Sequence, residues 1–451
     1  MLSWERSTAN LLTQPTNDRS DDRKIRTMTT PAPSAEPVRI ALIGAGNRGQ
    51  SYTRWIHAHP ELARLVAVAD PRPFQRAIVS AGDERVRHFD DWRELVAQPE
   101  RIADAVIIAT QDRQHVDPAI ACAGAGYAIL LEKPLAPTED ESRRIVSAVE
   151  RAGVLFGVCH VMRYMPYTDL VKQIVDSGVL GDIINVQHLE PVGWWHMAHS
   201  YVRGPWRRED EAAPMLLAKS SHDLDWIRYV TGKRIATVAS FGSRHHFRHE
   251  NRPAQAADRC LDCPLQNSCP YAAQKLYFPV VRTEGAVWPV TVITDDATEE
   301  GVRAALRTGP YGRCVYASDN TVVDNQVVAF QFEDGTAGTF TMTAFSEQEH
   351  RKTQIFGSHG MLDGDGEHVR VTDFRTGEST VHETGPTGAA NAGGDHGGGD
   401  GGVMAAFTAA VAAGDPSLIR SGPRESLDSH LAVFAAERSR HRGSVEPVPT
   451  A

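Results

Sequence analysis

The stretch that decides the fold is residues 38–49, VRIALIGAGNRG, an apolar run that ends in a glycine turn. The turn has the spacing G-x-G-x-x-G, in which glycines allow a tight bend and let backbone N–H groups approach a pyrophosphate at the start of a helix. With a strand before it, the turn predicts dinucleotide binding, although glycine turns also serve ordinary strand-to-helix packing. The cofactor-binding residues expected here are Gly44, Gly46, Asn47, Arg48 and Gly49.

A second apolar run, residues 65–70, ends in Asp70, well beyond Gly49 and at the end of the next expected strand. A carboxylate at this position can accept hydrogen bonds from both ribose hydroxyls of adenosine. It would repel a 2′-phosphate, so NAD is the expected cofactor, and Arg72 keeps NADP as an alternative. A helix-cap or turn role before Pro71 is the other interpretation of this aspartate.

Apolar strands alternate with helices as far as residue 160. Strands are expected at 104–110, at 127–131 and at 154–158, and helices near 92–96, 117–125 and 139–152. This alternation predicts a parallel, doubly wound sheet over residues 37–160.

The pattern changes in residues 161–435, where strands alternate between apolar and polar residues. A helix is expected at 167–177, strands at 183–189, 237–242, 325–332, 338–345 and 353–357, and a small hairpin strand at 369–373. These strands predict a mostly antiparallel sheet with helices on one face. The open face predicts a homodimer or homotetramer.

The composition narrows the class of protein. The chain has 451 residues, 41% of them hydrophobic, and a formal net charge of −10. This length predicts two domains, and the negative charge argues against nucleic acid or a membrane surface as a partner. No apolar run approaches the ~20 residues that span a bilayer, so a cytoplasmic protein is expected. Residues 1–36 are expected to be a disordered tail, with Met28 as an alternative start, and residues 436–451 a C-terminal tail.

Several motifs together resemble the Gfo/Idh/MocA family of glucose-fructose oxidoreductase and inositol dehydrogenase. They are the glycine turn, the tripeptide 132–134 (EKP), and the segments 163–166 (RYMP), 216–225 (LLAKSSHDLD) and 357–360 (GSHG). The resemblance covers roughly residues 37–435. It implies a Rossmann domain, a second domain with an open sheet, and redox chemistry at a sugar or polyol carbon with a nicotinamide cofactor. Further cofactor-binding residues expected from it are Thr110, His115, Glu132, Lys133 and Arg163.

Such chemistry needs a base for the hydroxyl proton and a group that steadies the reacting oxygen. Lys133 fits because burial beside a cofactor lowers the pKa of a lysine, and His222 fits because imidazole titrates near working pH. A surface ion pair between Lys133 and Glu132, and a histidine at a helix start, are the structural alternatives. Many family members have an aspartate four residues before this histidine, where the present chain has Ala218.

The missing acid puts a simple Lys-Asp-His triad in doubt. Lys219 is therefore a third catalytic candidate, facing the pocket or lying on the helix surface. We expect Asp223, Asp225 or Lys219 to contact His222 in place of the missing acid.

An aromatic loop, residues 193–207, and a glycine-rich loop, residues 393–402, are expected to build the substrate pocket. Aromatic faces cover the C–H faces of sugars, while His and Arg donate to hydroxyls or a carboxylate. Burial of the tryptophans in the core, and a low-complexity linker at 393–402, are the alternatives. The expected substrate-binding residues are Tyr164, Trp194, Trp195, His196, Arg203, Trp206, Asp223 and His396.

Four of the six cysteines cluster in an insertion at about 245–320. They are Cys260, Cys263, Cys269 and Cys314. A C-x-x-C pair with two further thiols fits a tetrahedral zinc site. Free thiols, disulfides, and an iron–sulfur cluster whose usual spacing differs, are the alternatives.

The leading functional prediction is an NAD(P)-dependent dehydrogenase of a sugar, sugar acid or cyclitol. One alternative oxidises a sugar carbon only transiently to permit glycosidic cleavage, with no net cofactor turnover. Another is a non-catalytic sensor, against which the presence of Lys133 and His222 argues.

Overall fold

The computed structural model describes residues 36–384 and 396–451. Residues 1–35, with the expected tail and Met28, and residues 393–395 of the glycine-rich loop lie outside the described residues.

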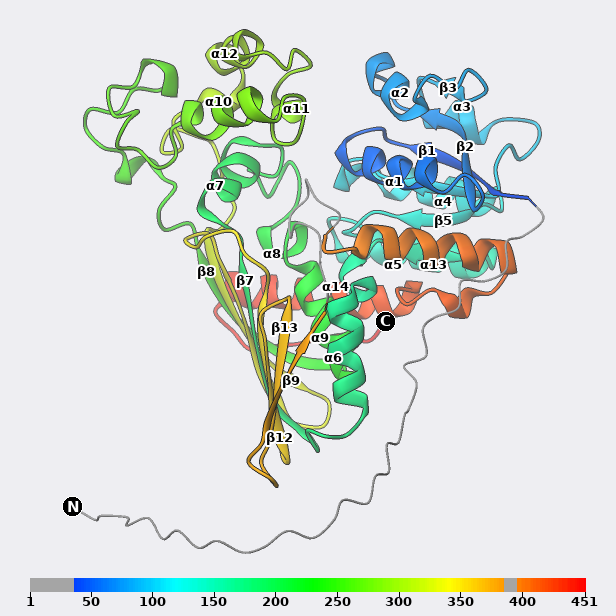
Figure 1. The fold of residues 1–451 in the computed structure, drawn as a ribbon, viewed down its shortest axis with the longest axis vertical. Coiled ribbons are helices and arrows are strands. Elements are labelled where there is room, and N and C mark those ends of the chain that lie inside the picture. The colour runs from blue at the N-terminus through cyan, green and yellow to red at the C-terminus, as the bar shows by residue number, and fades with distance from the viewer. Residues whose placement is uncertain (1–35, 385–395) are drawn as a thin grey trace, which may run out of the picture. The chain divides into compact units, whose positions relative to one another are not determined.

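The N-terminal domain is built on a six-stranded parallel sheet with the strand order β3-β2-β1-β4-β5-β6 (Figure 1). The strands are β1 (Val38–Ile43), β2 (Ala63–Ala69), β3 (Arg87–Phe89), β4 (Ala105–Ile108), β5 (Ala128–Leu131) and β6 (Phe156–Val158). The helices are α1 (Asn47–Ala58), α2 (Pro73–Ser80), α3 (Trp92–Val96), α4 (Val116–Gly124) and α5 (Glu139–Ala152). The order reverses between β1 and β4, which is where doubly wound sheets bind ligands outside the carboxyl ends of their strands. The predicted fold class of this domain is confirmed.

The second domain is built on a nine-stranded sheet with the order β14-β13-β12-β11-β7-β10-β9-β8-β15. Its strands are β7 (Ile183–Pro191), β8 (Ile235–Ser243), β9 (Asn325–Phe332), β10 (Ala337–Thr343), β11 (Lys352–Gly357), β12 (Gly360–Gly364), β13 (His368–Asp373), β14 (Ser379–Glu383) and β15 (Glu446–Pro447). Neighbouring strands run antiparallel except β7 and β10, which pair in parallel. The prediction of a mostly antiparallel sheet is therefore confirmed.

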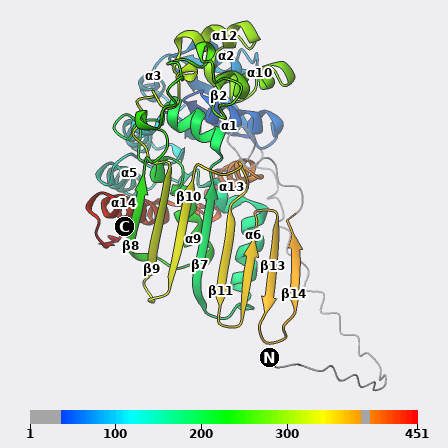
Figure 2. The same ribbon diagram turned by 90° about the vertical axis from the view of Figure 1, so that its left-hand side faces the viewer.

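Helices cover one face of this sheet. They include α6 (Pro166–Asp176), α9 (Ser221–Thr231) and α14 (Pro423–Arg442). The short helix α8 (Met215–Ala218) comes directly before α9 in the chain. Figure 2 looks onto the other face, where the strands lie in front of the helices. On that face Phe241 and Val327 stand opposite each other and are 73% and 41% exposed.

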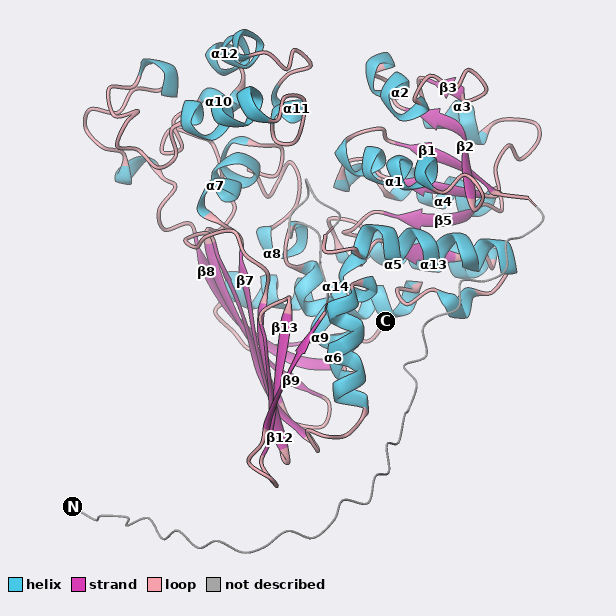
Figure 3. Cartoon of the chain, viewed as in Figure 1, coloured by secondary structure: helices cyan, strands magenta, loops and turns pink. Residues whose placement is uncertain are grey.

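The insertion carries helices of its own near the short helix α7 (Trp194–His196) (Figure 3). They are α10 (Ala273–Thr283), α11 (Val290–Ile293) and α12 (Glu299–Thr308), which pack around a small separate core.

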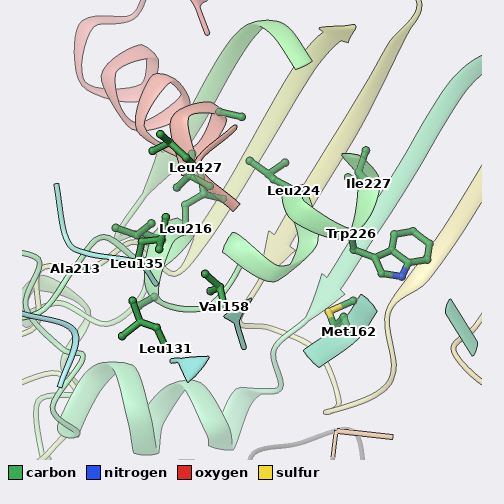
Figure 4. Close-up of a cluster of buried hydrophobic side chains, with 14 of the residues drawn as sticks. Leu131, Leu135, Val158, Met162, Ala213, Leu216, Leu224, Trp226, Ile227 and Leu427 are labelled. Atoms are coloured by element: carbon green, nitrogen blue, oxygen red, sulfur yellow. The ribbon is translucent and has the colours of Figure 1, made fainter. Parts of the chain in front are cut away.

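One buried hydrophobic cluster extends through both domains. Figure 4 shows Leu131 and Leu135, from the end of β5, with Leu216 of α8, Leu224 of α9 and Leu427 of α14. This shared core fixes the end of β5 against α8 and α9, the elements that carry the catalytic candidates.

The C-terminal part of the chain returns to the N-terminal domain. Helix α13 (Gly399–Ala413) contacts α1 and β1, and α14 contacts α5. Residues 436–451, expected as a tail, instead complete α14 and form β15 against β8. Among the described residues, no helix is long and apolar enough to cross a membrane.

Candidate active site

The glycine turn after β1 leaves space where a pyrophosphate is expected. A Cβ on Gly44, whose φ is +91°, would lie 2.6 Å from the Ala109 carbonyl oxygen, and one on Gly49 would lie 2.2 Å from the Gly44 oxygen. A Cβ on Gly46 would meet no atom within 4 Å. Gly46 also precedes the 12-residue helix α1 and provides no side-chain cap at its N-terminus, where phosphates bind in other dinucleotide-binding folds. These residues fit a dinucleotide phosphate.

Asp70 lies beside this turn at the end of β2. Its carboxylate accepts hydrogen bonds from the Ala45 N–H at 2.9 Å and from the backbone and side chain of Arg72 at 2.9 to 3.1 Å. Burial opposes its ionisation, but the hydrogen bonds from Arg72 and Ala45 keep the pKa of Asp70 below its usual value. Asp70 is therefore an ionised acceptor at the expected ribose position.

Arg48 and Glu132 are engaged with each other rather than held ready for a ligand. Arg48 donates to Glu132 Oε1 at 2.7 Å, to both oxygens of Asp400 at 2.8 Å, and to the Tyr52 hydroxyl at 2.7 Å. Tyr52 donates in turn to Glu132 at 2.5 Å. The guanidinium thus joins the glycine turn, the end of β5 and the start of α13.

Three other expected cofactor residues are tied to the protein itself. His115 is fully buried, with Nδ1 2.7 Å from the Pro134 oxygen and Nε2 3.3 Å from the Thr110 oxygen. The Thr110 hydroxyl donates to Gln114 O, and Arg163 forms a buried two-pronged pair with Asp225 at 2.6 and 2.7 Å. His115 thus links the loop after β4 to the segment that carries Lys133.

Lys133 lies at the end of β5 and reaches across to the second domain. Its Nζ donates to the Ala218 carbonyl oxygen at 2.5 Å, so the position of the missing aspartate still contacts the lysine, through its backbone. Burial lowers the pKa of Lys133, nearby Glu132 and Asp112 oppose this, and Lys219 adds to it.

His222 lies in the first turn of α9 and is 6% exposed. Its Nδ1 is buried without a hydrogen-bond partner in the described chain. Burial lowers the pKa of His222 well below its usual value, and the positive charge of Lys133 lowers it further. The ring is therefore neutral at ordinary pH and stands close enough to Lys133 to respond to its charge. Its centroid lies 6.0 Å from that of His160 and 6.4 Å from that of His396.

The expectation that Asp223, Asp225 or Lys219 contacts His222 is wrong. Asp223 accepts from His188 Nε2 at 3.1 Å and from Arg351 at 2.9 Å. Asp225 is held by Arg163, and Lys219 pairs with Glu190 at 3.2 Å. The physical reason is that each of the three side chains pairs with a side chain of opposite charge: Asp223 with Arg351, Asp225 with Arg163, and Lys219 with Glu190.

These pairs form a network that we call the inner charge network: Glu190, Lys219, Asp223 and Arg351. Arg351 bridges the two carboxylates, with Nε 2.6 Å from Glu190 and 2.9 Å from Asp223. Lys219 is 14% exposed, and its charge lowers the pKa values of Lys133, His196 and His396. Lys219 therefore faces the site and not the outer surface of its helix.

Glu190 and Arg351 were not predicted from the sequence. Both flank strands of the second sheet, at the end of β7 and just before β11, and they are far apart in the chain. The sequence offered one signal, a charged residue within a strand that alternates between apolar and polar residues. That signal does not identify the partner, because the two residues meet only in the folded structure.

The aromatic loop lines a region next to Lys219. His196 is 4% exposed, and burial, followed by Lys219, lowers its pKa well below the usual value. Trp195 and His196 pack on Trp288 of the insertion, with ring centroids 5.3 and 5.5 Å apart. Trp194 and Trp206 are partly exposed and pack against the main core.

Other expected substrate residues lie elsewhere or are already bonded. The Tyr164 hydroxyl accepts from the Arg420 N–H at 2.9 Å and lies 3.0 Å from the Ser421 hydroxyl. His396 lies 3.1 Å from Asp400, near a small cavity of about 20 Å³ that Arg351 also lines. Arg203 points to the cysteine cluster instead, where its Nη2 lies 3.2 Å from Cys260 Sγ.

The four clustered cysteines line one cavity of about 190 Å³. However, across residues 36–384 and 396–451, no group of three or more His, Cys, Asp or Glu side chains is arranged to hold a metal ion. The zinc prediction is therefore corrected: the thiols converge, but they surround a void instead of meeting at one point. The cysteines are free thiols in this structure.

Comparisons with known proteins agree with this architecture. Residues 38–160 match a family model described as an oxidoreductase family with an NAD-binding Rossmann fold, and residues 172–389 match the C-terminal alpha/beta domain of the same Gfo/Idh/MocA family. Inositol 2-dehydrogenase 2 of Saccharopolyspora erythraea is 30% identical over 208 residues, 46% of this chain and 58% of that protein. A 2,7-anhydro-N-acetylneuraminate hydratase of Escherichia coli is 25% identical over 205 residues, 46% of this chain and 52% of that protein.

A solved structure with the same fold is a levoglucosan dehydrogenase in complex with NADH and levoglucosan. It aligns with a TM-score of 0.65 at 20% identity and covers 92% of this chain and 100% of that one. The sequence matches span only about half the length of the curated relatives.

Proposed function

Because the chain belongs to the Gfo/Idh/MocA family of oxidoreductases, we propose that it transfers a hydride between a nicotinamide dinucleotide and a carbinol carbon of a sugar, sugar acid or cyclitol. The observation that carries this proposal is the hydrogen bond from Lys133, at the end of β5, to the Ala218 carbonyl, four residues before the buried His222. The inositol and levoglucosan dehydrogenases among the similar proteins support the substrate class.

The chain's own residues supply the proton chemistry. A bound nicotinamide would accept the hydride of the carbinol C–H, while the O–H proton must leave as the C=O bond forms. His222 is the base for that proton, because its lowered pKa keeps the ring unprotonated. The Lys133 ammonium uses one N–H on Ala218 and directs the others at the substrate oxygen, where negative charge develops.

The inner charge network and the aromatic loop are proposed to hold the substrate. Lys219 presents a cation for substrate hydroxyls or a carboxylate, and Trp195 an apolar face for ring C–H groups. Asp70 is proposed to bind the ribose hydroxyls and to favour NAD, and Arg72 provides the route by which NADP would be accepted.

Deuterium transfer tests the proposed function directly. The full chain is incubated with NAD and a panel of sugars, sugar acids and cyclitols that are deuterated at single carbinol carbons. We expect one class to pass deuterium to the nicotinamide, and to lose this transfer in Lys133→Ala while NAD binding remains. No transfer from any class would refute hydride chemistry in this chain.

A second candidate rests on the hydratase relative, whose name describes no net oxidation. In that case the hydride returns to the substrate, so product forms without accumulation of NADH. The same experiment separates the two candidates, because deuterium is then found in the product and reduced cofactor stays below one equivalent.

The exposed face of the nine-stranded sheet is proposed as a homodimer or homotetramer interface. Phe241 and Val327 lie side by side on it, and large exposed apolar side chains in contact favour association. Light scattering should find an oligomer that Phe241→Glu shifts toward monomer, and a wild-type monomer at working concentration would contradict the proposal.

A further inference from the structure

His222 is placed to take a proton from the substrate but not to keep it. The residue is 6% exposed, and its Nδ1 has no hydrogen-bond partner within the described chain. Burial and the nearby charge of Lys133 both disfavour a positive charge on this ring. In the proposed oxidation, each cycle leaves one proton on His222. A second group must therefore carry that proton to solvent.

Two histidines lie next to His222, and they differ in their access to water. The ring centroids of His160 and His396 are 6.0 and 6.4 Å from that of His222. His160 is 0% exposed, and neither of its ring nitrogens has a hydrogen-bond partner among the described residues. The His396 side chain is 17% exposed. Of these two rings, His396 is the one that connects His222 with solvent.

Asp400, in the first turn of α13, orients the His396 ring. Nδ1 of His396 lies 3.1 Å from Asp400 Oδ1 and, farther off, 3.5 Å from Arg48 Nη1, and within the described chain the ring makes its hydrogen bonds through Nδ1. Burial opposes ionisation of Asp400, but Arg48 donates to both of its oxygens at 2.8 Å and keeps its pKa well below the usual value. An ionised carboxylate only accepts hydrogen bonds, so Nδ1 carries the hydrogen and Nε2 keeps a lone pair for an incoming proton.

We propose that His396 is the second acid–base group of the site and that Asp400 positions it. After the carbinol O–H proton has moved to His222, it passes to His396 Nε2, directly or through one bridging water. The Asp400 carboxylate stabilises the resulting imidazolium, which releases the proton to solvent from its exposed side. One proton enters and one leaves, so both rings end the cycle neutral. This inference rests on the proposed hydride transfer and adds the route by which its proton leaves.

Turnover of His396→Gly tests the proposal. Glycine suits the φ of +49° at this position and leaves room for imidazole added to the buffer. We expect turnover to fall by about 10²-fold, with NAD affinity unchanged, and imidazole to restore much of it. Hydride transfer in the first turnover should change less, because His222 still takes the first proton.

His350→Ala is the matched control. The His350 side chain is 19% exposed, lies 3.5 Å from the Glu367 carboxylate and lines the same small cavity as His396. Its removal should leave turnover unchanged. Wild-type turnover in His396→Gly, or a loss that imidazole does not relieve, would overturn the relay.

A measurement that needs no turnover separates this proposal from the proposed function. Nitrogen-15 NMR of the full chain with labelled histidines reports which ring nitrogen carries the hydrogen, and the His396 signal is assigned by its loss in His396→Asn. We expect the hydrogen on Nδ1. A hydrogen on Nε2 would overturn the relay alone in a chain that transfers deuterium, whereas absence of deuterium transfer from every substrate class would refute the hydride chemistry, and the relay with it, whichever tautomer is found.

Discussion

Two buried aspartates of the site are each bonded to an arginine, but the two arginines differ in exposure. Asp70 pairs with Arg72, its near neighbour in the chain, and the arginine side chain is 58% exposed. Asp223 pairs with Arg351, which is distant in the chain, and the side chains of this pair are 0% and 13% exposed. A ligand can displace the exposed Arg72 at little cost in free energy, whereas the buried Arg351 is part of the scaffold. The cofactor end is therefore adjustable and the inner charge network is fixed.

Removal of Lys133 should have the largest effect, because it acts where the fixed region meets the reacting oxygen. Lys133→Ala should lower turnover by about 10² to 10⁴-fold, as expected for a positioned acid–base group. NAD affinity, measured by calorimetry, should change little. Lys172→Ala, which removes a partly exposed lysine paired with Asp176, is the matched control. Equal turnover in the two variants would remove Lys133 from the chemistry.

Removal of Arg351 tests whether the inner charge network is a scaffold. Arg351→Met leaves Glu190 and Asp223 buried without their shared cation, and breaking a buried pair costs about 3–5 kcal/mol. Urea unfolding should show this loss. Arg72→Ala, the same kind of deletion at the adjustable end, should stay within about 0.5 kcal/mol. Similar losses in both variants would erase the distinction between the two regions.

Acid should lower the free energy of unfolding through the buried histidines of the protein interior. Burial lowers the pKa values of His160 and His199 to about 3, against about 6.5 in the unfolded chain. Below pH 6.5 the unfolded state therefore binds more protons than the folded state, so stability falls as pH falls. Each histidine contributes about 1.4 kcal/mol per pH unit once the unfolded chain is protonated.

Urea unfolding between pH 7.5 and 5.5 measures this slope. At the acid end of the range, His199→Phe should make the slope shallower by nearly one proton, whereas His441→Gln, at a 60% exposed side chain, should leave it unchanged. A slope that His199→Phe does not alter would contradict the burial argument.

Removal of Asp70 tests the cofactor end of the site. Asp70→Ala should weaken NAD binding by about 1–3 kcal/mol, the loss expected for hydrogen bonds to a charged acceptor, and should reduce the preference for NAD over NADP. Calorimetry with both cofactors measures it. Unchanged NAD affinity would exclude Asp70 from the ribose site.

The comparison also explains what the sequence could predict. The glycine turn, Asp70 and Lys133 are set by local patterns at strand ends, and the parallel sheet and most strands followed from periodicity. Glu190 and Arg351 were missed because their pairing depends on β7 and β11 lying next to each other. The zinc prediction failed because the spacing of cysteines in the sequence does not determine the distances between their sulfur atoms in the folded chain.

The ion pair between Arg48 and Asp400 determines when the N-terminal domain can be completed during synthesis of the chain. These residues are 352 positions apart, and α13, which carries Asp400, packs on β1 and α1. An emerging N-terminal domain therefore holds Arg48 and Glu132 without their third partner until most of the chain has been translated. Until then its first helix presents an unfinished apolar surface, which a chaperone is suited to protect. The nucleotide-binding half is thus the first part to be made and among the last to be completed.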